Sequence, residues 1–190
     1  VSVIYFNPIF CSPSNHKYNT SDYSRIDPSF GTQEEFTRLC EKAKAMGIRI
    51  ILDGVLSHTG SDSIYFNKTG EYGSGGAYRS QSSPYYKWFD FERWPDKYDC
   101  WWGFDTLPNV KEMEPDYIDY MLTGENAILP MWLEKGASGW RLDVADELPD
   151  EFLKLLYDRV KEINPEAYVL GEVWEDASNK QAYGKRRKYF

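Results

Sequence analysis

The sequence predicts an α/β fold, a partial (β/α)8 TIM barrel of four strands that amounts to about half of a barrel. Strand-like apolar runs alternate with helix-like segments along the 190 residues, and a helical connection returns the chain to a parallel strand. Three successive strand patterns end in a carboxylate, at Asp53, Asp143 and Glu172. Reactive side chains gather at the carboxyl ends of barrel strands, and a whole barrel has eight strands in about 250 residues.

Residues 1–60 hold the first two strand patterns, with one helix between them. Residues 1–6 read as a strand, and residues 48–53 read as a buried strand. The capping box of residues 32–35 begins the helix, and Gly47 ends it. The expected apolar stripe of this helix consists of Phe36, Leu39, Cys40, Ala43 and Met46. We assign residues 1–60 to the barrel.

A long excursion follows the strand of residues 48–53. From residue 61 to residue 110 neither strand nor helix periodicity persists, and Gly, Ser, Tyr and Trp are frequent. The segment is too aromatic for a disordered linker, and long loops in compact domains are usually functional. We therefore expect residues 61–110 to form a small inserted subdomain.

Residues 111–190 return to barrel helices and strands. Residues 116–122 and 126–135 read as helices, and Pro130 predicts that the second one is short or kinked. A strand pattern begins at Gly139, and the acidic start and apolar spacing of residues 149–164 predict a further helix.

The segment of residues 139–147 dominates this region. Its apolar residues alternate with Arg141 and Asp143, so these two side chains project from one face of a strand. A helix and a second strand that ends at Glu172 follow, with the length of a βαβ crossover. Asp143 and Glu172 then lie at the carboxyl ends of neighbouring parallel strands. This arrangement suits a pair in which one carboxyl group attacks and the other donates a proton.

Composition narrows the choice of partners and compartment. The net charge of -8 and the pI of about 4.9 argue against nucleic acid and anionic membranes as partners. No apolar run reaches the length of a membrane span. Cys11, Cys40 and Cys100 are odd in number and widely spaced, which favours a reducing compartment, so we expect a cytoplasmic rather than a secreted protein. Both ends of the chain look cut, so we expect the true N-terminus to lie outside it.

Four segments together resemble the α-amylase family of retaining glycoside hydrolases (glycoside hydrolase family 13). They are residues 15–23, 53–58, 139–147 and 171–174, in the order and on the elements that the family uses. The likeness is closest to the branch of neopullulanases, cyclomaltodextrinases and maltogenic amylases. It covers nearly the whole chain, as part of a catalytic domain.

The resemblance implies roles for the charged residues. Asp143 would be the nucleophile that forms a covalent glycosyl ester, and Glu172 would be the acid and then the base. Glu172 would need a raised pKa, while Arg141 would keep Asp143 ionised and aimed. Asp53 would position Arg141 and His58 from behind. An internal ion pair between Asp53 and Arg141 is the plainer reading of the same two residues.

The resemblance also implies substrate contacts. Tyr18 would stack on the sugar ring, and His58 would hydrogen-bond its hydroxyls. Glu147 and Trp174 would line the leaving-group side. Plain packing remains an alternative for Tyr18 and Trp174.

The sequence departs from the family at Ser57, where many members have an Asn that binds calcium. A hydroxyl is a poorer calcium ligand than an amide carbonyl, so we expect neither a metal nor another cofactor. The third catalytic carboxylate of the family lies after a seventh strand, and the chain ends before it. We therefore expect the chain alone to be inactive and to self-associate through its truncated barrel edges.

The resemblance implies an endo-acting enzyme that cleaves α-1,4-glucosidic bonds of starch, pullulan or cyclodextrins with retention. A transglycosylase or isomerase of the same family is one alternative, and a non-catalytic glucan-binding member is another.

Overall fold

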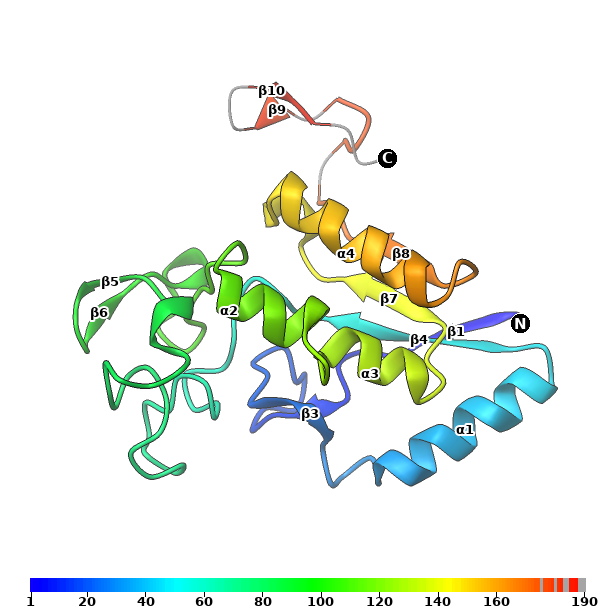
Figure 1. The fold of residues 1–190 in the computed structure, drawn as a ribbon, viewed down its shortest axis with the longest axis horizontal. Coiled ribbons are helices and arrows are strands. Elements are labelled where there is room, and N and C mark those ends of the chain that lie inside the picture. Colours follow the sequence, from blue (N-terminus) through cyan, green and yellow to red (C-terminus); the bar gives the residue numbers. More distant parts are fainter. Residues whose placement is uncertain (175, 180, 183–184, 188–190) are drawn as a thin grey trace.

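A parallel sheet of four strands lies at the centre of the chain (Figure 1). The computed structural model describes residues 1–174, 176–179, 181–182 and 185–187. The sheet order is β1-β4-β7-β8, with β1 at Val3–Tyr5, β4 at Arg49–Gly54, β7 at Gly139–Leu142 and β8 at Tyr168–Gly171. All three neighbouring pairs are parallel. Sheet order and direction thus follow chain order, which confirms the partial (β/α)8 barrel.

The connections between the strands run through helices. Figure 1 shows α1 (Gln33–Ala45), α3 (Ile128–Glu134) and α4 (Asp150–Ile163) running beside the sheet. Their inner residues join the strands in one hydrophobic core, whose largest fully buried members include Trp132, Trp140 and Phe152. The central strands β4 and β7 therefore lie between packed layers, as buried parallel strands do.

The helix α1 begins as predicted. Thr32 accepts a hydrogen bond from the Glu35 N–H, and the Glu35 side chain accepts one from the Thr32 N–H. The predicted apolar stripe is wrong at two positions, because Leu39 is 43% exposed and Met46 is 75% exposed. Met46 lies at the C-cap, beyond the last helical residue.

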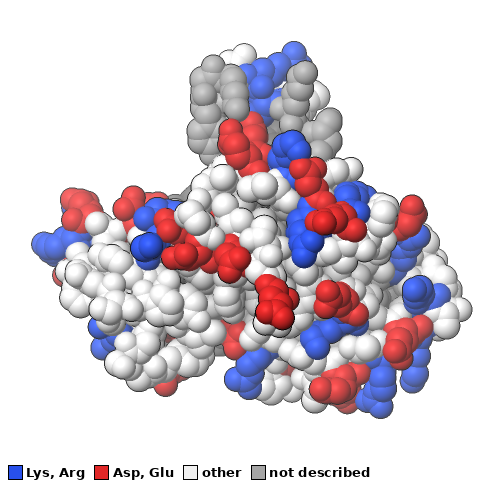
Figure 2. Space-filling view, in the orientation of Figure 1, with Lys and Arg blue, Asp and Glu red and all other residues white. Residues whose placement is uncertain are grey.

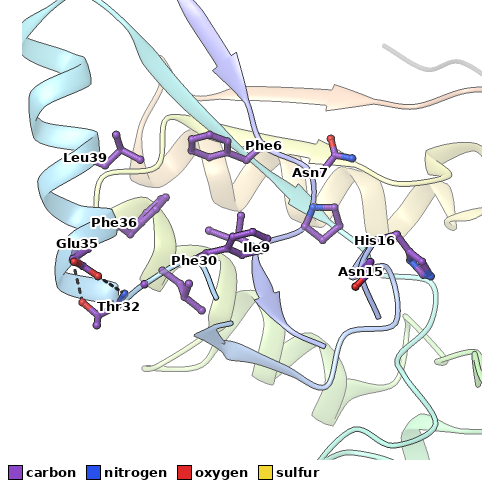
Figure 3. A pocket seen from close by; sticks show the side chains of 13 residues that line it. Phe6, Asn7, Ile9, Asn15, His16, Phe30, Thr32, Glu35, Phe36 and Leu39 are labelled. Carbon is purple, nitrogen blue, oxygen red and sulfur yellow. Dashed lines mark hydrogen bonds between the residues drawn. The ribbon is translucent and has the colours of Figure 1, made fainter. Parts of the chain in front are cut away.

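Leu39 is exposed because it lines an open apolar cavity of about 750 Å³ between α1 and the end of β1. Figure 3 shows Leu39 and Phe36 on the helix facing Phe6 and Ile9 across this cavity. None of the site residues predicted from the sequence lines it. The cavity is thus separate from the carboxylate cluster described below.

The loop after β1 contains a pairing that the sequence reading missed. Phe10–Cys11 (β2) pairs antiparallel with Asp22–Ile26 (β3). The two-residue strand β2 is too short to show any periodicity, so only the fold reveals it. The excursion contains the short antiparallel pair β5 (Phe91–Arg93) and β6 (Lys97–Tyr98) beside clustered aromatic rings. Its predicted boundaries as a subdomain stay a prediction.

The helices after the excursion are shorter than predicted. The segment 116–122 forms α2 (Pro115–Ile118) and then a wider π-type turn at Asp119–Thr123. The helix α3 is short, as Pro130 predicted, and Pro130 is its third residue. The first four N–H groups of a helix have no partner within it, so a proline there removes no hydrogen bond. A last antiparallel pair joins β9 (Gln181–Ala182) and β10 (Lys185–Arg186).

Acidic and basic side chains are interspersed on the face shown in Figure 2. In the coloured part of this view, red and blue groups alternate over α1, α3 and α4, and much of the excursion is uncharged. The net charge of -8 is therefore spread over this face rather than gathered in one field.

Candidate active site

One guanidinium, that of Arg141, contacts three carboxylates. Its Nη1 lies 2.9 Å from Asp53 Oδ2 and 2.8 Å from Asp143 Oδ1, and its Nη2 lies 2.7 Å from Glu172 Oε1. The side chains of Arg141, Asp53 and Asp143 are 12%, 0% and 11% exposed, and that of Glu172 is 31% exposed. The two predicted catalytic carboxyl groups thus converge on one cation, with Glu172 nearer to solvent.

Sheet register explains this convergence. Asp53 of β4 pairs with Arg141 of β7, so neighbouring parallel strands present the two side chains on the same face. Main-chain hydrogen bonds continue past the strand ends, from Asp143 N–H to Gly54 O and from Glu172 N–H to Leu142 O. These bonds hold the two carboxylate-bearing residues in place at the carboxyl edge of the sheet.

The residue after Asp143 has an unusual backbone. Val144 adopts φ +40° and ψ +48°, in the left-handed region, which is strained for a β-branched residue. In this conformation its N–H donates a hydrogen bond to Glu172 Oε2 at 3.1 Å. Glu172 therefore accepts hydrogen bonds on both carboxyl oxygens, from the Val144 N–H and from Arg141.

The electrostatic balance corrects the expected protonation states. Burial raises the pKa of Asp143 to about 7, and the charge of Asp53 raises it further against the opposing effect of Arg141. Partial burial raises the pKa of Glu172, but hydrogen bonds from Val144 and Trp174 and the charge of Arg141 together bring it below its usual value. In this arrangement Glu172 is the ionised group, so the expectation of a raised pKa for Glu172 is wrong. Arg141 also does not outweigh the burial of Asp143.

Asp53 has more partners than predicted, and one residue was missed. Besides Arg141, it accepts hydrogen bonds from the hydroxyls of Tyr5 and Tyr18, the latter at 3.2 Å. The Arg141 guanidinium also lies over the Tyr5 ring, 5.7 Å from its centroid. Burial and the hydrogen bond with Asp53 raise the pKa of Tyr5. The available signal was its position as the last residue of the first strand, at the edge where the carboxylates gather.

His58 is held by the protein on both ring nitrogens. Its Nδ1 lies 3.0 Å from the Ser57 hydroxyl, and its Nε2 lies 3.1 Å from the Tyr18 carbonyl oxygen. Burial lowers its pKa to about 4, so the ring is neutral at neutral pH. The hydrogen bonds of Asp53 run to Arg141, Tyr5 and Tyr18, so His58 is positioned by Ser57 and Tyr18 instead. A hydrogen bond from His58 to a sugar stays a prediction.

Glu147 and Trp174 lie together with two tryptophans of the excursion that the sequence reading did not select. The indole N–H groups of Trp101 and Trp102 donate to Glu147 Oε2 at 2.8 Å and Oε1 at 2.9 Å. Trp174 is 55% exposed and meets both rings edge-on, at centroid distances of 6.3 and 5.6 Å. The only hint in the sequence was the adjacent pair of tryptophans.

Trp102 is itself unusual. It is 65% exposed and has φ +51°, in the left-handed region. The Trp101 ring also lies 5.5 Å from the His58 ring. The excursion therefore reaches the neighbourhood of the carboxylate cluster through Trp101 and Trp102.

Metal and membrane features were checked in the part of the chain that the structure describes. Within it, no three His, Cys, Asp or Glu side chains are grouped so that they could hold a metal ion. No described helix combines the length and apolar character that crossing a bilayer requires. Cys11, Cys40 and Cys100 are free thiols.

A parallel half-barrel that gathers carboxylates at the carboxyl ends of its strands defines the chain as part of an α/β-barrel enzyme. Comparison with known proteins makes this specific, because residues 1–189 match the model of the α-amylase catalytic domain. The chain belongs to the α-amylase family of glycoside hydrolases.

Individual relatives agree with this assignment. The chain is 45% identical to an amylopullulanase of Thermoanaerobacterium saccharolyticum, covering 94% of this chain and 15% of that protein. It is 37% identical to neopullulanase 2 of Thermoactinomyces vulgaris, covering 94% and 30%. Among solved structures, the debranching enzyme of Nostoc punctiforme superimposes with a TM-score of 0.80 at 37% identity, covering 94% and 36%. The chain thus spans well under half of the length of these three relatives.

Proposed function

We propose that the protein is an endo-acting hydrolase of α-1,4-glucosidic bonds in starch, pullulan or cyclodextrins, and that it acts with retention. The observation that carries this proposal is the convergence of Asp143 and Glu172 on Arg141. Retaining glycosidases need two carboxyl groups close enough to flank one anomeric carbon. The names of the amylopullulanase and neopullulanase relatives support an α-glucan substrate.

In the proposed reaction the Asp143 carboxylate attacks the anomeric carbon. The bond to the leaving oxygen breaks, and this oxygen takes the proton of Glu172. Water then attacks the glycosyl ester, its proton passes to Glu172, and the ester bond to Asp143 breaks. Because Glu172 pairs with Arg141 in the free protein, its carboxyl must leave the guanidinium and take up a proton as the substrate enters.

Other site residues support substrate binding. We propose that Tyr18 stacks on the sugar at the cleavage point and that His58 hydrogen-bonds its hydroxyls. Glu147 and Trp174 would contact the sugar on the leaving-group side. The partial exposure of Glu147 and the exposure of Trp174 support this placement. Rigid aromatic faces are suited to sugar rings.

Two variants test the catalytic pair. Asp143→Asn and Glu172→Gln in the full-length protein should each lower turnover of maltooligosaccharides by about three orders of magnitude or more. The anomer of the first product, followed by proton NMR, should be α if the reaction retains configuration. Near-normal turnover by either variant, or a β product, would contradict the proposal.

We further propose that the 190-residue chain alone turns over little or no glucan. The described carboxylates around Arg141 are Asp53, Asp143 and Glu172, whereas the family uses a third catalytic carboxylate from a later strand. A reducing-sugar assay on the purified chain tests this directly, and robust turnover would show it to be wrong.

A further inference from the structure

We infer that Trp101 and Trp102 are positioning residues, whose paired indoles hold the Glu147 carboxylate ready for a sugar on the leaving-group side. The inference rests on the proposed function and adds a task for the excursion. In this view the excursion determines how firmly the protein holds the sugar beyond the cleaved bond.

The hydrogen bonds define the orientation of Glu147. One indole donates to each carboxyl oxygen, Trp101 to Oε2 at 2.8 Å and Trp102 to Oε1 at 2.9 Å. Two donors on two oxygens fix both the plane and the direction of the group. An ionised carboxylate has about four acceptor positions, so the two that remain can accept sugar hydroxyls.

The backbone around the two tryptophans is arranged for this pairing. Consecutive side chains in extended backbone point to opposite sides, yet these two indoles reach the same carboxylate. The left-handed conformation of Trp102, with φ +51° and ψ +25°, accompanies this arrangement. The turn is closed by hydrogen bonds from the Trp101 N–H to Leu107 O and from the Phe104 N–H to Trp101 O, both about 3.0 Å or shorter. A strained conformation persists only where its surroundings determine it.

Trp174 connects this group to the proposed acid. Its ring meets the Trp102 ring edge-on at 67° and the Trp101 ring at 88°. Trp174 also donates a hydrogen bond to Glu172. The excursion, Glu147 and the residues beside Glu172 therefore form one contiguous set of contacts on the exposed side of the cluster.

A purely structural role is the alternative, in which the indoles only attach the excursion to the barrel. The two roles differ in their dependence on the leaving group. A positioning role affects only substrates that place sugar hydroxyls near Glu147. A structural role affects every substrate alike.

The test compares maltotriose, whose leaving group is a sugar, with p-nitrophenyl α-maltoside, which can release nitrophenol and so place no sugar there. Trp102→Phe in the full-length protein keeps an aromatic ring but removes the N–H donor. We expect kcat/KM for maltotriose to fall about 10-fold, the effect of losing a hydrogen bond to a charged group. For the nitrophenyl substrate we expect a change of no more than about 2-fold. Equal losses on both substrates, or no loss on maltotriose, would overturn the inference.

Trp94→Phe is the matched control. It makes the same substitution in the excursion and also removes an indole hydrogen bond, but that bond runs to the Ala77 carbonyl oxygen at 2.9 Å. We expect it to change neither ratio. A selective loss on maltotriose in this control as well would overturn the inference, because it would trace the effect to the excursion in general.

A second variant keeps the test decisive if Trp102→Phe does not fold, as judged by its melting temperature. Glu147→Gln leaves both indoles in place and should show the same selective loss. In the double variant Trp102→Phe/Glu147→Gln the maltotriose loss should stay within about 2-fold of that of Glu147→Gln alone. Losses that multiply would show that Trp102 acts independently of Glu147. Absence of turnover in the unsubstituted full-length protein would instead refute the proposed function itself.

Discussion

Glu172 Oε1 lies 2.7 Å from Arg141 Nη2, while the other terminal nitrogen of the same guanidinium contacts Asp143 and Asp53. The proposed acid and the proposed nucleophile therefore compete for one cation in the free protein. Glu172 gains more from it, because it is less buried and also receives the Val144 N–H. The pKa of Asp143 consequently rises to about 7, while that of Glu172 falls.

This relationship predicts the pH dependence of kcat/KM, which reports the free enzyme. Between the lowered pKa of Glu172 and the value of about 7 for Asp143, the pair holds one proton. The reactive form also holds one proton, on Glu172, so it is a constant fraction of the protein in this range. Above pH 7 that proton is lost. We therefore expect kcat/KM to fall about 10-fold per pH unit above pH 7.

Asp53→Asn tests the cause of the raised pKa. The charge of Asp53 raises the pKa of Asp143, and its removal also leaves Arg141 free to pair more closely with Asp143. Both effects lower the pKa, so the alkaline limb should move down by about one pH unit, as expected for the loss of a neighbouring charge. A limb that stays in place or moves to higher pH in this variant would contradict the assignment.

Glu112 predicts a pH-dependent stability. Burial raises its pKa to about 7, and the charges of Asp99 and Glu147 contribute. The folded chain thus binds this proton more tightly than the unfolded chain. The stability it provides is complete below the unfolded pKa of about 4.5 and is lost as pH rises through about 7. Glu112→Gln should therefore raise the free energy of unfolding at pH 8 by up to roughly 3 kcal/mol, with little change at pH 4.5.

Urea unfolding at the two pH values measures this difference. Glu134→Gln, at an exposed glutamate of α3, is the control and should show no such dependence on pH. Equal effects of Glu112→Gln at pH 4.5 and pH 8 would show that the carboxyl group does not change its protonation state on folding.

Gly139 predicts a backbone requirement of the β7–β8 pair. It has φ +147°, and a Cβ on it would lie 2.1 Å from the Tyr168 carbonyl oxygen. Since that oxygen belongs to backbone, Gly139→Ala must push the two strands apart, and we expect a loss of at least about 3 kcal/mol. Gly47→Ala is the matched control, because Gly47 has φ +72° but no heavy atom within 4 Å of the added Cβ. It should cost about 1–2 kcal/mol from strain alone. Similar losses for the two variants in urea unfolding would contradict the clash.

The outer strands of the sheet predict self-association of the isolated chain. In the described residues β1 and β8 are the ends of the strand order, and Ile4 and Leu170 on them are 37% and 55% exposed. Unpaired edges with apolar side chains favour pairing between chains. Leu170→Lys should shift sedimentation velocity profiles towards monomer, because charged edge residues oppose such pairing. Leu155→Lys, at a 41% exposed leucine of α4, should not. A clean monomer without any substitution would count against this prediction.

The sequence by itself determined the strands, the helix α4 and the candidate carboxylates. Apolar alternation and helix caps are local patterns, and they placed Asp53, Asp143 and Glu172 at strand ends without any tertiary information. Motif likeness added the family. The pairing of β2 with β3 was missed because the signal of a two-residue strand is weaker than that of its loop.

Only the tertiary structure decided which groups share a proton and which side chains hold the site. The order of the Asp143 and Glu172 pKa values depends on burial and on distances to Arg141, and neither can be read from spacing along the chain. Tyr5 and Asp53 are 48 residues apart, and Trp101 and Glu147 are 46 residues apart. Local periodicity carries no information on contacts at such separations, since packing of the whole chain brings these groups together.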